Sequence, residues 1–257
     1  MDVMSRISLK SLRTFNLTMA LLHALQGCIV LALSRNFDLT VKTDHLVYNE
    51  MTQTLDLKQA HVLTISLPLL IAAFFLLSSL AHLIIATVYR RTYEANLKRG
   101  INKARWIEYS LSASIMIVAI SLLVGIYDIS ILVSVFALTA VMNLTGLIME
   151  VSNQGAKRPQ WLSFKVGTFA GMVPWLIIAF YFWASSHYGD AQPPTFVYWI
   201  FVSIFLFFSC FAVNMLLQYK KIGPWKDYLY GERAYIILSL VAKSALAWQV
   251  FAGTLRP

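Results

Sequence analysis

The sequence predicts an all-α membrane protein, a seven-transmembrane-helix bundle, on two observations. Of 257 residues, 58% are apolar and 13% are charged, whereas roughly 25% of a typical soluble domain is charged. A helix needs about 20 residues to cross about 30 Å of hydrocarbon, and seven apolar stretches are that long. They cover residues 15–34, 62–88, 106–126, 130–149, 163–184, 196–218 and 234–252. We expect one domain, residues 1–257, in the cell membrane as a multi-pass protein.

The first stretch is expected to be a true span, although Arg6, Lys10 and Arg13 precede it as in a signal peptide. Its apolar run continues for about 20 residues, longer than the usual signal core of about 7 to 15. The first, third and seventh stretches carry internal polar residues, and such residues usually face the interior of a bundle. These three spans are therefore expected to line a site.

Basic residues predict the orientation, because 16 of the 21 Lys and Arg fall on one side of the membrane. These are Arg6, Lys10, Arg13, Arg90, Arg91, Lys98, Arg99, Lys103, Arg105, Lys157, Arg158, Lys165, Lys220, Lys221, Lys226 and Arg233. By the positive-inside rule the N-terminus is cytoplasmic and the C-terminus is extracellular. The net charge of +9 is then a topology signal. We expect no nucleic-acid partner, since that would need a soluble basic domain.

The segment between Arg35 and Gln59 is the first external loop, and its residues partly alternate between apolar and polar. With a turn-like sequence at 48–50, this pattern predicts a β-hairpin. A disordered polar loop is the alternative, because an isolated hairpin is only marginally stable.

Lys243 lies near the middle of the last stretch, and it is the only Lys or Arg that this interpretation cannot place at a water interface. An unpaired ammonium at that depth costs about 2.5 to 3.5 kcal/mol. Glu108 is the only carboxylate that we place within a stretch. A buried base and a buried acid on different helices make a natural ion pair.

Five polar residues are expected at a similar depth and would form a hydrated polar cavity on the cytoplasmic side of Lys243. They are His23, Gln26, Ser78, His82 and Ser239. Either histidine alone is better explained as a hydrogen-bonded core residue, but their common depth with Glu108 favours a functional set. No metal site is expected, because no HxxxH or ExxH pair occurs on a single helix.

Aromatic residues fill the outer half, as in IFVSIFLFFSCF in the sixth stretch and GMVPWLIIAFYFW in the fifth. Such stripes are usually packing, but beside a buried amine they indicate a slot for a long flat hydrocarbon. A lysine amine can condense with an aldehyde to form a Schiff base. The protonated Schiff base then needs a counter-ion, for which Glu108 is the candidate.

Four runs resemble heliorhodopsins: SLVAKSALAWQVFAGTL, RWIEYSLSAS, GERAYIILSL and GMVPW. The resemblance covers essentially the whole chain, including the predicted topology and the long external loop. It implies all-trans retinal bound covalently to Lys243, with Glu108 as counter-ion. It places Ser239, Tyr109 and Ser112 at the chromophore, and Trp248, Phe205, Phe207 and Phe208 as candidates for contact with the polyene. His23 and His82 would belong to the cytoplasmic cavity.

The resemblance also implies a homodimer and a β-hairpin in the first external loop. One departure is Thr139, where we expect an amide side chain in a relative. The basic loop YRRTYEANLKRGINKAR indicates contact with anionic membrane lipid. A cytoplasmic signalling partner is left open.

The predicted function is light sensing, through all-trans to 13-cis isomerisation with a slow cycle. We expect no efficient pumping, because no second acid is placed inside the membrane. No nucleophile and base are grouped as an enzyme would need. Three alternatives stay open: a proton-coupled transporter or a light-driven ion transporter that uses Glu108 and Lys243, or a structural protein that buries this pair for specificity.

Overall fold

A computed structural model describes residues 7–189 and 193–257. Arg6, counted above among the cytoplasmic basic residues, lies outside these ranges. Seven described helices are long and apolar enough to span a membrane, as the sequence predicted. They are α1 (Leu9–Leu33), α2 (Leu67–Ala86), α4 (Lys103–Leu123), α5 (Ile129–Ser152), α6 (Leu162–Tyr188), α7 (Thr195–Tyr219) and α8 (Tyr228–Val250), which continues as a π-helical turn, η2 (Phe251–Leu255).

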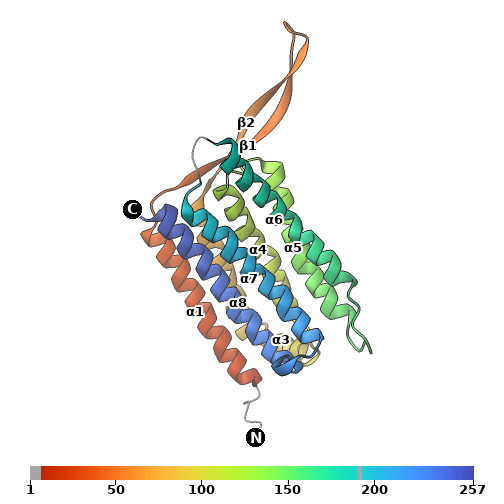
Figure 1. The fold of residues 1–257 in the computed structure, drawn as a ribbon. Helices are drawn as coiled ribbons and strands as arrows, with labels where there is room; N and C mark the ends of the chain where they lie inside the picture. Colours follow the sequence, from red (N-terminus) through yellow and green to blue (C-terminus); the bar gives the residue numbers. More distant parts are fainter. Residues whose placement is uncertain (1–6, 190–192) are drawn as a thin grey trace.

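The spanning helices run side by side, and the two chain ends lie at opposite ends of the bundle (Figure 1). The N-terminal end also carries the short helix α3 (Arg90–Lys98) and a 3-10 turn, η1 (Gly223–Lys226). Helix α4 is the most buried span, with 72% of its apolar window inside the bundle. It packs against α2 and α5, and α8 packs against α7 and α1. The polar residues Glu108, Ser112, Ser239 and Lys243 of α4 and α8 are buried in the bundle, as the sequence predicted.

Polar side chains cap the starts of several helices. Asn102 accepts a hydrogen bond from the backbone of Arg105 at the start of α4, and Asp227 accepts one from Leu229 at the start of α8. Asp128 accepts from two backbone amides at the start of α5. Such caps satisfy amides that the helix itself leaves without partners.

The predicted β-hairpin is present: β1 (Asp38–Asn49) pairs antiparallel with β2 (Thr54–Ser66). It projects from the end of the bundle that holds the C-terminus (Figure 1). Its base is attached to the bundle, since the Lys42 amide donates to the Tyr127 carbonyl over 2.9 Å. The adjoining Arg35 side chain donates to the Thr254 carbonyl, also over 2.9 Å. These contacts supply the packing that an isolated hairpin lacks.

The starts of three predicted spans were wrong. The first span begins at Leu9 rather than at 15. Residues 62–66 belong to β2, so the second span begins at Leu67 rather than at 62. Pro68 fits there because proline is tolerated in the first turn of a helix. The last span begins at Tyr228 rather than at 234, which brings Glu232 into the helix that carries Lys243.

Candidate functional site

The structure brings Lys243 of α8 and Glu108 of α4 together in the middle of the bundle. Lys243 Nζ lies 3.3 Å from Glu108 Oε1, and both side chains are less than 10% exposed. Lys243 also donates a hydrogen bond to Ser239 Oγ over 2.7 Å, one turn earlier on α8. Ser78 of α2 donates to Glu108 Oε1 over 2.5 Å. The amine and the acid form a buried pair with a polar partner on each side.

Tyr109 of α4 forms a wall beside the amine. Lys243 Nζ lies 5.4 Å from the centre of its ring, within the range of a cation–π interaction. The Tyr109 hydroxyl donates to the carbonyl of Tyr235 over 2.9 Å. This bond fixes the backbone of α8 one turn before Ser239.

The two histidines stack near this pair. His23 of α1 and His82 of α2 lie with ring centres 5.5 Å apart and ring planes 9° from parallel. His82 Nδ1 lies 2.7 Å from Asn16 Oδ1. Neither ring nitrogen of His23 has a hydrogen-bond partner among the described residues. Ser78 and His82 adjoin Glu108 as predicted, whereas His23 reaches the site through its stacking on His82.

A small cavity of about 40 Å³ opens beside Lys243. Tyr109, Ser112 and Ser239 line it, and Ser112 Oγ is buried with no partner in the described chain. A larger cavity of about 180 Å³ adjoins it between α4, α5, α6 and α7. The two share Met142, Asn143, Phe208 and Phe211 as lining residues. Together they form an apolar slot that starts at the amine.

Aromatic rings shape the larger cavity. Trp175 of α6 packs edge-on against Phe205 and Phe208, with ring centres 5.3 and 5.5 Å away. Both phenylalanines line the cavity, whereas Phe207 lines neither of the two and packs, partly buried, against the apolar core. Asn143 places an amide in the cavity wall one turn after Thr139, and it donates to the Thr139 carbonyl over 2.9 Å.

A comparison with protein-family models matches residues 12–255 to the heliorhodopsin model. The chain belongs to the heliorhodopsin family. No curated protein matches it. Membership makes the chain a rhodopsin-type, light-sensing membrane protein with a retinal chromophore. Together with the seven apolar helices, it supports the multi-pass membrane location.

Two predicted residues of this heliorhodopsin lie away from the cavity beside Lys243. Trp248 Nε1 donates to Gln26 Oε1 over 3.0 Å, which joins α8 to α1. The Trp248 ring packs edge-on against Phe251, with ring centres 5.6 Å apart. Gln26 therefore pairs with Trp248 instead of joining the histidines, because it lies toward the C-terminal end of α1, level with a later turn of α8.

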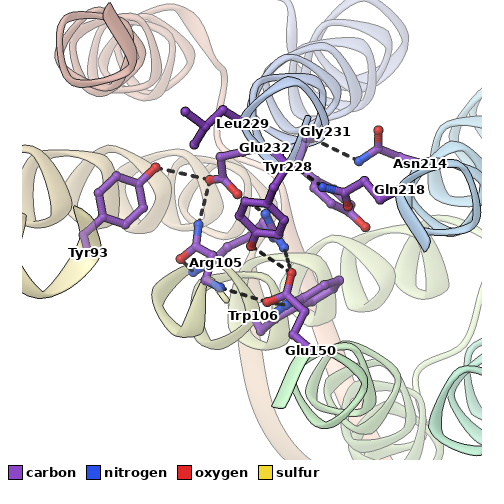
Figure 2. A network of polar contacts seen from close by, with 12 residues as sticks. Tyr93, Arg105, Trp106, Glu150, Asn214, Gln218, Tyr228, Leu229, Gly231 and Glu232 are labelled. Carbon is purple, nitrogen blue, oxygen red and sulfur yellow. Dashed lines mark hydrogen bonds and ion pairs between the residues drawn. The ribbon is translucent and has the colours of Figure 1, made fainter. Parts of the chain in front are cut away.

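Figure 2 shows a second buried charge cluster, which the sequence did not reveal. Its residues lie near the start of α4, the end of α5 and the start of α8, and so nearer the N-terminal end of the bundle. Arg105 of α4 forms ion pairs with Glu150 of α5 and with Glu232 of α8. All three are at most 5% exposed. Two predictions were therefore wrong: Lys243 is not the only buried base, and Glu108 is not the only carboxylate within a span. We call these three residues the Arg105 cluster.

The two carboxylates of the Arg105 cluster are well supplied with donors (Figure 2). Besides Arg105, Glu150 accepts from the backbone N–H of Asn102 (2.8 Å), from Trp106 Nε1 (2.7 Å) and from the Tyr228 hydroxyl (3.0 Å). Glu232 accepts from Asn102 Nδ2 (2.7 Å) and the Tyr93 hydroxyl (3.2 Å), besides Arg105.

Aromatic rings flank the guanidinium, which lies 4.1 Å above the Tyr235 ring and 4.7 Å above the Trp106 ring. Tyr93 belongs to α3, outside the spans. Burial raises the pKa of Tyr93 well above its ordinary value. Its hydroxyl therefore stays protonated and remains a donor. The cluster joins α3, α4, α5 and α8.

The cluster was missed because its residues lie near helix ends. Arg105 follows a run of basic residues and was assigned to the cytoplasmic interface, and the last span was expected to begin after Glu232. The available signal was charge balance. One arginine and two glutamates lie at the same end of three spans. Arg105 and Glu150 have apolar or aromatic neighbours on both sides, and Glu232 stands two residues before the last predicted span.

Proposed function

We propose that this member of the heliorhodopsin family senses light through all-trans retinal held by Lys243 as a protonated Schiff base. Glu108 acts as its counter-ion. The observation that carries this proposal is the 3.3 Å approach of Glu108 Oε1 to Lys243 Nζ at the mouth of an apolar slot. When bound, the retinal supplies a light-driven change of shape, from all-trans to 13-cis.

The residues around Lys243 fit such a chromophore. The two adjoining cavities suit a long flat hydrocarbon, and their aromatic walls offer faces and edges for packing. Ser112 has a buried hydroxyl without a partner in the described residues, at the wall of the cavity beside the amine. Ser239 and Ser78 hold the amine and the carboxylate in position.

The positions of the acids support a sensor without efficient pumping. A pump needs proton acceptors and donors on both sides of the lysine. Glu108 and Glu232 lie near the starts of α4 and α8, and Glu150 lies near the end of α5. These helix ends are at the N-terminal end of the bundle, so all three acids lie on that side of Lys243 (Figure 1). At the other end Asp128 is engaged in capping α5. This one-sided arrangement supports a sensor without efficient pumping, although acids besides Glu108 are buried in the bundle.

A light-driven or proton-coupled transporter is the second candidate. The Arg105 cluster favours it, because Glu150 and Glu232 add carboxyl groups between Glu108 and one end of the bundle. Illumination of cells or vesicles that contain the protein separates the two functions. A sensor gives no sustained pH change. A transporter gives one that a protonophore abolishes.

Several further properties belong to this proposal. The cycle is slow, the output is sensory rather than enzymatic, and the N-terminus is cytoplasmic. The protein is a homodimer, and its basic segment around α3 contacts anionic lipid and can serve a cytoplasmic partner.

A visible absorption spectrum of the purified protein, with and without added all-trans retinal, tests the proposed function. We expect a visible band only with retinal, and Glu108→Gln should shift that band. A protein that stays colourless with retinal contradicts the proposal.

A further inference from the structure

The Arg105 cluster has more negative than positive charge if both of its carboxylates are ionised. Arg105 is the partner of both Glu150 and Glu232, and no other Lys, Arg or His forms an ion pair with either in the described residues. A buried, uncompensated charge is strongly unfavourable, and a carboxyl group in that position usually takes up a proton instead.

The hydrogen bonds indicate which carboxyl takes the proton. Glu150 Oε2 has two donors, the backbone N–H of Asn102 and the indole N–H of Trp106, and both groups can only donate. A proton on that oxygen would face two N–H groups. The other oxygen of Glu150 is occupied by Arg105 and the Tyr228 hydroxyl. Glu150 is therefore built to be ionised.

Glu232 accepts from fewer donors than Glu150, and one side of its carboxyl group faces a cavity rather than a donor. It lines a third cavity, of about 20 Å³, which Glu150 does not line. Arg105, His82 and Glu108 line the same cavity. A water needs about 10 to 15 Å³ and two to four polar partners, so this space suits one water. Arg105 Nε is buried without a partner among the described residues and offers such a water a donor.

We propose that the Arg105 cluster binds one proton in the resting protein, and that Glu232 holds it on the side that faces the small cavity. Glu150 is then ionised and pairs with Arg105, so the cluster is neutral. A single water in the cavity links the Glu232 carboxyl to Glu108 and His82.

The groups that face Glu232 agree with this assignment. Tyr93 donates to Glu232 and carries no charge as a phenol, and Arg105 supplies the one positive charge of the cluster. Across the cavity, Glu108 is compensated by Lys243. A change in the charge of Glu108 would therefore act on the proton of Glu232, through the shared water.

Infrared spectroscopy tests this proposal. The sample is the full-length protein, with or without retinal, labelled with ¹³C at the glutamate carboxyl groups. A protonated carboxyl has a carbonyl stretch that an ionised one lacks, and the label moves it to lower frequency. We expect a labelled band at neutral pH. It should persist in Glu150→Asp, which leaves the labelled Glu232 in place. In Glu232→Asp the band should move to the unlabelled position, because aspartate carries no label.

The surface variant Glu94→Gln serves as the control and should keep the labelled band. A wild-type protein without any protonated glutamate overturns the proposal, as does a labelled band that survives in Glu232→Asp. Thermal unfolding gives a second measurement. Glu232→Gln replaces one neutral side chain by another and should fold and melt close to wild type, whereas Glu150→Gln should melt at a clearly lower temperature. A Glu232→Gln variant that does not fold also overturns the proposal.

Discussion

Ser78 donates its hydrogen bond to Oε1 of Glu108, the same oxygen that faces Lys243. The serine and the amine therefore compete for one lone-pair region of the counter-ion. The charge that a bound chromophore experiences depends on a side chain of α2 as well as on α4 and α8.

Ser78→Ala should shift the visible band of the retinal-loaded protein to shorter wavelength. Without the serine, the negative charge of Glu108 is less dispersed and stabilises a positive charge at Lys243 more strongly. Loss of a buried hydrogen bond to a charged group should also cost about 1.5 to 3 kcal/mol of stability. Ser79→Ala is the matched control, because Ser79 donates to the Ala20 carbonyl away from the site. Equal spectra for wild type and Ser78→Ala contradict this assignment.

Two substitutions of Tyr109 separate its hydroxyl from its ring. Tyr109→Phe removes the bond to the Tyr235 carbonyl and should lower stability by about 1 kcal/mol while leaving absorption nearly unchanged. Tyr109→Leu also removes the ring that faces Lys243 and should shift absorption as well. Visible spectra and thermal melts of the two variants provide the measurement. A spectral shift as large in the phenylalanine variant as in the leucine variant would show that the ring is not the important contact.

Arg105→Gln should lower the free energy of unfolding by about 3 to 5 kcal/mol, because it leaves two buried carboxyl groups without their cation. Arg91→Gln, at an exposed position on α3, should change it little. Denaturation of both variants in the same detergent is the measurement. Similar stability of the two variants would mean that the Arg105 cluster does not hold α4, α5 and α8 together.

Gly171→Ala should destabilise the contact between α5 and α6 by about 1 to 3 kcal/mol. A Cβ at this position would overlap the Met142 side chain, which lines both cavities of the slot. Met142 is flexible, so Met142→Ala should rescue much of the loss when combined with Gly171→Ala. A double variant whose loss equals the sum of the two single losses would show that the two positions do not interact.

The sequence predicted the seven spans, the hairpin and the pairing of Lys243 with Glu108. These depend on apolar length, on alternation, and on the cost of an unpaired charge at bilayer depth. It could not predict the partners of Gln26 and Trp248, because a shift of one helical turn between α1 and α8 decides whether Gln26 faces the histidines or the tryptophan.

Charges near helix ends were harder still to place. Arg105 looks like one more residue of a basic loop until α4 is seen to begin at Lys103 and to turn that side chain inward. Glu232 precedes the last span predicted from sequence, which starts at 234, whereas α8 begins at Tyr228. Helix boundaries from sequence are uncertain by several residues, and here that uncertainty concealed a three-residue charge cluster.

The colour of Lys243→Ala tests whether this lysine holds the chromophore. Wild type and the exposed control Lys165→Ala should each form a visible band when incubated with all-trans retinal. Lys243→Ala should form none and leave only the absorption of free retinal. A visible band of normal position in Lys243→Ala would show that the chromophore is held elsewhere, and the account of this site would be wrong.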